Sequence, residues 1–143
     1  MHHKRVAFHA VDGHGMDIYH TNVMMALGET FVVICMETIR NQEEKMNLIK
    51  HFERTKKDII DISLDQMMLF AGNMLQVRND FEETFLVMSK QAFDSLNGAQ
   101  IGHIQRHTQI LYADIKTIET YGGGSVRCMM AELFFDKKTN EWG

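Results

Sequence analysis

The segment Asn22-Val-Met-Met-Ala-Leu27 begins a pattern that the chain repeats twice more. The second copy is Asn73-Met-Leu-Gln-Val-Arg78 and the third is Ser125-Val-Arg-Cys-Met-Met130, so the copies start near residues 22, 73 and 125 at an almost constant spacing. Each copy carries apolar residues that are typical of a β-strand. The spacing therefore indicates an internal repeat, and each copy would be the opening strand of one repeat unit.

The first two units share one predicted order of elements. A second apolar run follows the opening strand and predicts a β-hairpin. Apolar residues then recur at helical spacing, and a third strand closes the unit. The second runs, helices and third strands fall at 31–37, 46–52 and 58–63 in the first unit and at 84–89, 93–104 and 109–115 in the second. We therefore predict an α/β fold made of strand-strand-helix-strand units, with only the opening strand of a third unit.

The length of the chain fits a single domain. Its 143 residues lie within the usual size of one domain. Two units and one strand are nevertheless fewer than a closed ring of such units needs. We expect residues 1–143 to form one partial domain, which a longer protein or several assembled chains would complete. The alternative is a generic α/β domain in which the spacing is coincidental.

Composition excludes several classes of partner. The 15 Lys and Arg residues against 19 Asp and Glu residues give a net charge of -4, whereas nucleic-acid binding requires clustered positive charge. No apolar run approaches the ~20 residues that span a bilayer, and residues 1–11 lack the features of a secretory signal. The two cysteines suit a reducing compartment. We expect a cytoplasmic protein that binds neither nucleic acid nor membrane.

The glycine run Gly122-Gly-Gly124 precedes the one cysteine with a candidate chemical role, Cys128. Glycine allows a ligand to approach the backbone closely, and a cysteine beside such a turn can be a nucleophile, although a buried inert cysteine is the commoner state. Cys35 lies in a continuous apolar run and is expected to be such a core residue. His20 lies at the start of the first unit, at the end equivalent to Cys128 in the third. If the inner ends of the units converge, the two residues form a Cys–His pair.

His103 and His107 stand four residues apart in the second predicted helix, a spacing that can chelate a metal. No third ligand is evident, and the H-E-x-x-H pattern is absent. We therefore expect a solvated helix face and no metal site. The glycine run also lacks the spacing of a dinucleotide loop or P-loop, so no cofactor is expected.

Three segments together resemble the guanidino-group modifying superfamily, the penteins. They are Tyr19-His-Thr-Asn-Val-Met-Met25, Phe70-Ala-Gly-Asn-Met-Leu75 and Gly122-Gly-Gly-Ser-Val-Arg-Cys-Met-Met-Ala-Glu132. Within the superfamily, the chain is most similar to arginine deiminase-related citrulline-utilisation hydrolases and amidinotransferase-like proteins. The resemblance extends from about Phe8 to Phe135.

The resemblance implies a five-fold α/β-propeller, of which this chain would supply about two and a half modules. It also implies a hydrolase in which a cysteine thiolate attacks the guanidinium carbon and forms a covalent thiouronium intermediate. Cys128 matches the nucleophile and His20 the general acid and base, while Gly123, Gly124 and Asn22 would contact the guanidino substrate.

Two departures from the family pattern modify this expectation. Family members are about twice as long, and their first half supplies carboxylates that bind the guanidinium group. This chain has Asn22 where arginine deiminases carry an acidic residue. We therefore expect the C-terminal half of such an enzyme, which self-associates or needs a complementary N-terminal half. The alternatives are an inactive binding module and transfer of the amidino group to an amine instead of water.

Overall fold

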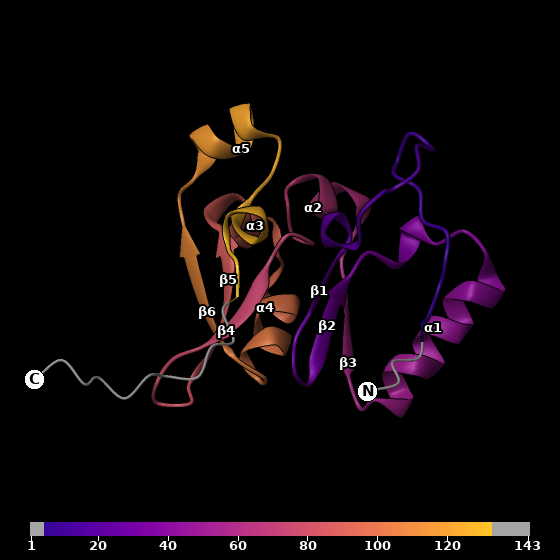
Figure 1. Cartoon of the computed structure of the whole chain (residues 1–143), viewed down its shortest axis with the longest axis horizontal. Helices are drawn as coiled ribbons and strands as arrows, with labels where there is room; N and C mark the ends of the chain where they lie inside the picture. Colours follow the sequence, from indigo (N-terminus) through magenta and orange to yellow (C-terminus); the bar gives the residue numbers. More distant parts are fainter. Residues whose placement is uncertain (1–4, 133–143) are drawn as a thin grey trace, which may run out of the picture.

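The first unit is a three-stranded sheet covered by one long helix (Figure 1). The computed structural model describes residues 5–132. The elements of this unit are β1 (Met25–Leu27), β2 (Phe31–Ile34), α1 (Gln42–Arg54) and β3 (Asp58–Asp61), with the short 3-10 helices η1 (Thr21–Val23) and η2 (Met36–Thr38) on either side of the hairpin. β2 is the central strand and is wholly buried, antiparallel to β1 and parallel to β3. A parallel return requires a crossover, which α1 supplies.

The second unit repeats this arrangement beside the first. It contains β4 (Leu75–Arg78), β5 (Thr84–Ser89), α3 (Lys90–Ser95), α4 (Gly98–Gln105) and β6 (Gln109–Ala113), and its sheet order is β4-β5-β6. β5 is antiparallel to β4 and parallel to β6. The predicted order of strand, strand, helix and strand is therefore present in both units, and the α/β class is confirmed. The two sheets remain separate within residues 5–132 and do not close into a ring.

Both crossovers are fixed by caps at their helix starts. The Asn41 side chain accepts hydrogen bonds from the backbone N–H groups of Glu43 and Glu44 at the start of α1. Asn97 and Gln100 form a capping box at the start of α4. The helical region over 93–104, which was expected around a break at Gly98, is therefore divided into α3 and α4. α4 ends at Gln105, which places His107 in the turn after the helix and corrects the expectation that it lies within it.

The links between the units contain three helices that the sequence did not indicate. They are α2 (Leu64–Met68), α5 (Lys116–Gly122) and α6 (Val126–Met129). The prediction of a third opening strand from residue 125 is therefore wrong over the described residues, because α6 occupies this segment. Local bonding favours this turn: the Cys128 N–H donates to the Ser125 carbonyl at 3.0 Å, and the Arg127 N–H donates to the Asn73 side chain at 3.0 Å.

The two units touch where the second begins. A side-chain carbon on Gly72 would lie 2.5 Å from the carbonyl oxygen of Val23, so glycine is required for this approach. One core cluster runs through both units and includes Phe31, Met74 and Ile104. Cys35 lies within this core, as expected, and burial raises the pKa of its thiol to about 11. Across residues 5–132, the helices are too short or too polar to cross a membrane.

Candidate active site

Cys128 lies at the surface of the molecule, on the single turn of α6. Its thiol contacts the side-chain amide of Asn73, which belongs to the link before β4. The Asn73 Nδ2 atom lies 3.3 Å from Cys128 Sγ and donates to it, while Oδ1 lies 3.7 Å away and can accept from the S–H group. Of these two contacts, the N–H donor favours the thiolate, which is the nucleophilic form of cysteine.

Asn73 itself is held in one orientation. It is only 5% exposed, and its Oδ1 accepts from the Arg127 N–H at 3.0 Å. Its Nδ2 also donates to the Asn22 carbonyl at 3.1 Å. Because one end of the amide faces a donor and the other an acceptor, the assignment of its nitrogen and oxygen is fixed by the hydrogen bonds. The donor beside Cys128 is therefore pre-organised.

His20 is joined to the same network through Asn22. The Asn22 N–H donates to Nδ1 of His20 at 3.1 Å, and His20 caps the start of η1. Nδ1 is thus the unprotonated nitrogen of the neutral ring, and Nε2 carries the proton. The backbone of Asn22 connects both catalytic candidates, since its N–H contacts His20 and its carbonyl contacts Asn73.

These residues line one cavity of about 470 Å³. Cys128, His20, Asn22, Gly123 and Gly124 all form part of its wall, so the structure brings together every site residue that the sequence indicated. A volume of this size suits a small molecule. The remaining lining residues are largely apolar, and they are Tyr19, Val23, Met67, Met68, Phe70 and Asn73.

Glycine is required at two positions of the cavity wall for different structural reasons. Gly123 has a φ of 67°, in the left-handed region that favours glycine. A side-chain carbon on Gly124 would lie 3.0 Å from Cys128 Sγ. Gly124 therefore leaves room for the thiol, and Gly123 permits the turn that leads into α6.

Carboxylates are lacking among the described residues that line the cavity. Asp12 and Asp17, the acidic residues of the loop before His20, have other partners. Asp12 accepts from the backbone N–H groups of Met16 and His14, and the bond from Met16 is the main cause that lowers its pKa. Asp17 lies 2.7 Å from the His9 side chain. Neither contacts the cavity, so this part of the chain offers no group that would bind a guanidinium by charge.

Asn73 is the site residue that reasoning from the sequence did not single out. It was present in the segment Phe70-Ala-Gly-Asn-Met-Leu75, and it begins the second repeat just as Asn22 begins the first. That equivalence was a usable indication. An asparagine at the head of a strand is common in turns, however, and only the structure shows its amide beside Cys128.

Known proteins resemble this chain in sequence and in fold. Residues 1–135 match the model of the family described as N,N dimethylarginine dimethylhydrolase, eukaryotic. Among solved structures, the fold is similar to the apo crystal structure of ArgZ, described as an arginine dihydrolase from the ornithine-ammonia cycle in cyanobacteria, with a TM-score of 0.60 and 11% identity. That similarity covers 84% of this chain but 17% of the other, and it concerns the fold alone. No curated protein matches the sequence.

Proposed function

This chain belongs to the family of eukaryotic N,N dimethylarginine dimethylhydrolases, and we propose that it carries the nucleophile of a hydrolase acting on the guanidino group of arginine or of an N-methylated arginine. The family match confirms the resemblance to the guanidino-group modifying superfamily. One observation carries the proposal: Cys128 has a fixed N–H donor at 3.3 Å and shares a cavity with His20.

In the first step, the Cys128 thiolate attacks the guanidinium carbon and a C–S bond forms. The adduct then collapses, the bond from carbon to the leaving nitrogen breaks, and the amine departs with a proton from His20. The product of this step is a thiouronium bound to Cys128. The side-chain N–H of Asn73 donates to Cys128 Sγ when the sulfur is a thiolate, which is the case at the start and at the end of each catalytic cycle.

In the second step, water attacks the thiouronium carbon and transfers a proton to His20. The C–S bond breaks, a ureido product leaves, and the thiolate is restored. His20 must therefore alternate between two protonation states. Because its Nδ1 accepts the Asn22 N–H, the doubly protonated ring must turn away from that bond, and the exposed position of His20 at the cavity wall allows this rotation.

The guanidinium group requires acidic partners that the described part of this cavity lacks. We propose that a further polypeptide supplies them, as a complementary N-terminal half or a second copy of the chain.

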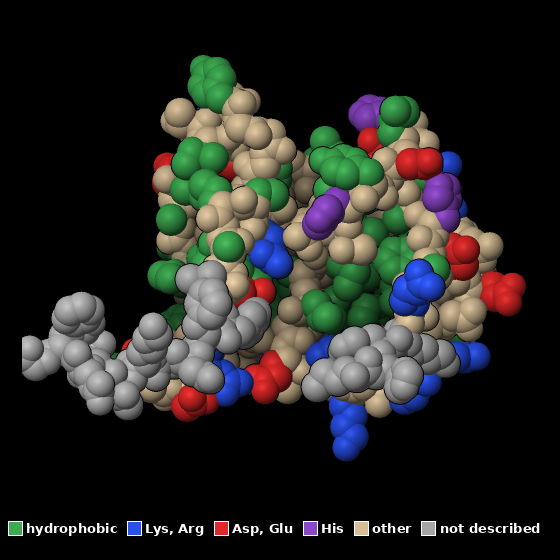
Figure 2. Space-filling view, viewed as in Figure 1, with side chains coloured by type: hydrophobic (Ala, Val, Ile, Leu, Met, Phe, Trp, Pro, Cys, Tyr) green, Lys and Arg blue, Asp and Glu red, His purple; other side chains and the backbone are tan. Residues whose placement is uncertain are grey.

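β6 is the strand that we propose this further polypeptide contacts. α4 packs on β3 of the first unit, whereas β6, which occupies the equivalent place in the second unit, leaves Leu111 53% and Tyr112 46% exposed. Figure 2 shows hydrophobic side chains over the part of the surface that β6 and α5 form. The complete assembly would then be the five-module propeller.

The test is to assay citrulline release from arginine and from dimethylarginine, for the purified chain alone and for the chain co-expressed with the acidic half of a family member. We expect little release alone and turnover in the co-expressed sample. Cys128→Ala should abolish the turnover, whereas Cys35→Ser should preserve it. A Cys128→Ala sample that remains active would exclude the mechanism. Light scattering of the same samples measures assembly, and a strict monomer in both would exclude the role of β6.

If the co-expressed sample assembles but neither releases citrulline nor forms an adduct on Cys128, the chain is a binding module and not part of an enzyme. If an added amine receives the amidino group, the chain belongs to an amidinotransferase.

A further inference from the structure

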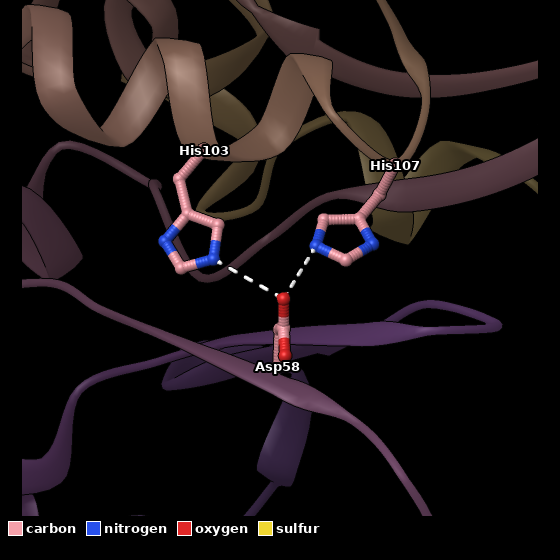
Figure 3. A group of neighbouring side chains, drawn as sticks. All are labelled: Asp58, His103 and His107. Carbon is pink, nitrogen blue, oxygen red and sulfur yellow. Dashed lines mark hydrogen bonds and ion pairs between the residues drawn. The ribbon is translucent and has the colours of Figure 1, made fainter.

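Three side chains of types that can ligate a metal meet at the boundary between the two units, away from the cavity of Cys128. His103 comes from α4, His107 from the turn that follows it, and Asp58 from the first residue of β3. Figure 3 shows both imidazole rings directed at the same carboxylate from the opposite unit. From these contacts we propose that Asp58, His103 and His107 bind one zinc ion, which clamps the first unit to the second.

The spacing of the ligand atoms supports this site. Asp58 Oδ2 lies 3.1 Å from His107 Nε2 and 3.5 Å from His103 Nε2, and the three ligand atoms lie within 4.8 Å of one another. Zinc binds nitrogen and oxygen ligands at about 2.0–2.2 Å, so two ligands of a tetrahedral ion are roughly 3.4 Å apart. The two distances to Asp58 bracket that value.

Hydrogen bonding alone does not account for the cluster. Among residues 5–132, the buried His103 Nε2 has no hydrogen-bond partner, because its distance to Asp58 is too long for a normal hydrogen bond. Buried polar atoms without a partner are rare in proteins and call for a specific reason. A metal ion between the three groups would satisfy this nitrogen.

The second nitrogen of His107 is held in the way that metal-binding histidines are. Its Nδ1 lies 2.8 Å from Thr30 Oγ1, and its ring packs on Phe31, with ring centres 5.3 Å apart. A hydrogen bond on the distal nitrogen sets the tautomer and orients the ring for metal binding. Thr30 and Phe31 belong to the first unit, so His107 is fixed by that unit on both sides.

Charge and access also fit a divalent cation. Two neutral imidazoles and one carboxylate give the site a charge of about -1, and this donor set suits zinc. The ammonium of the neighbouring Lys57 is turned away, since it donates to the carbonyls of Gly28 and Glu29 at 2.9 and 2.8 Å. Asp58 is 59% exposed, which leaves an entry path and a fourth position for water.

The correction to the sequence interpretation is specific. His103 and His107 were expected on a solvated helix face with no third ligand. In the structure, their side chains are only 28% and 14% exposed, and the third ligand comes from the other unit. Asp58 is distant in sequence, and nothing in its surroundings marks it as a ligand.

The test is isothermal titration calorimetry, in which zinc alone is added to the chain and the heat of binding is measured. Because His2, His3 and Cys128 could also bind zinc, the background protein carries His2→Ala, His3→Ala and Cys128→Ser. We expect one zinc per chain. Asp58→Asn, His103→Gln and His107→Gln should each weaken the affinity at least tenfold, and Thr30→Val should weaken it by about tenfold through His107. His51→Gln, at a partly exposed position of α1, is the matched control and should leave the affinity unchanged.

Two further measurements keep the test decisive if a variant misfolds. On the background protein, zinc should shift the imidazole NMR signals of His103 and His107 and leave those of His51 in place. A zinc concentration about 100 times the dissociation constant should multiply the ratio of folded to unfolded protein about 100-fold. Unmoved signals of His103 and His107, or equal zinc affinity in the background protein and all three ligand variants, would overturn the proposal.

Discussion

Replacing Asn73 by Asp changes the environment of Cys128 without changing the shape of the side chain. The new carboxylate keeps an oxygen to accept the Arg127 N–H, so that contact survives. The other end loses its N–H donors to Cys128 Sγ and to the Asn22 carbonyl. A negative oxygen then lies where Nδ2 is now, 3.3 Å from the sulfur. The thiolate is disfavoured for both reasons.

The size of the effect follows from this distance. Two like unit charges about 3.3 Å apart repel by about 1.3 kcal/mol in bulk water and by about 5 kcal/mol at an effective dielectric constant of about 20. Cys128 is exposed, so the repulsion is closer to the lower value. The lost hydrogen bond, taken at the value of an ordinary one because sulfur is a weak acceptor, adds about 1 kcal/mol. The total, roughly 2 kcal/mol, corresponds to a decrease of about 30-fold in the population of thiolate.

Alkylation by iodoacetamide measures this population, because only the thiolate reacts quickly. The rate at Cys128 is followed at neutral pH by peptide mass mapping, and the fall should be at least tenfold in Asn73→Asp. Asn73→Leu, which removes the donor without adding charge, should slow the reaction by about fivefold. A rate at Cys128 that is unchanged in Asn73→Asp, in protein that retains its fold by circular dichroism, would refute the role of Asn73.

Further changes test other parts of the structure. Gly124→Ala should slow alkylation of Cys128, because the new methyl group would lie 3.0 Å from Sγ. Gly98→Ala, whose methyl group would meet nothing within 4 Å among residues 5–132, is the control and should leave the rate unchanged. Gly72→Ala should lower the free energy of unfolding by about 1–3 kcal/mol in a denaturant titration, since its methyl group would press on the backbone at Val23; stability equal to that of Gly98→Ala would contradict the close contact of the units. Cys35 favours the neutral thiol in the folded state, so stability should fall between the unfolded pKa of 9.0 and the folded value of about 11; the fall should be smaller in Cys35→Ala, and parallel pH curves would contradict the burial of this thiol.

The repeat was readable from the sequence because its strands are periodic and apolar. The buried run Phe31–Ile34 and the partner segments of both hairpins lie where the pattern placed them. The third copy led to a wrong prediction of a strand, because Ser125 to Met130 has the same apolar spacing but contains α6. Spacing alone could not separate a strand from a single helical turn that is held by the Asn73 side chain.

The positions of the site residues were more predictable than their bonding. Cys128 and His20 could be placed together because the sequence repeat assigned them to equivalent positions, and both line the same cavity although Cys128 lies on a helix. The role of Asn73 could not be found in this way, because it depends on the direction of one amide group. Asp58 could not be identified as a candidate ligand for a similar reason. Its proximity to His103 comes from the packing of one unit on the other, which no local sequence pattern encodes.

The central claim is that Cys128 forms a covalent bond with the guanidinium carbon. The most direct measurement is the mass of the chain after it is mixed with dimethylarginine and quenched in acid, for the chain alone and with a complementary acidic half. The account predicts, in the sample with the acidic half, an adduct on the peptide of Cys128 equal to the substrate minus dimethylamine, and no adduct in Cys128→Ala. Citrulline release without modification of Cys128, or neither adduct nor citrulline in either sample, would contradict it.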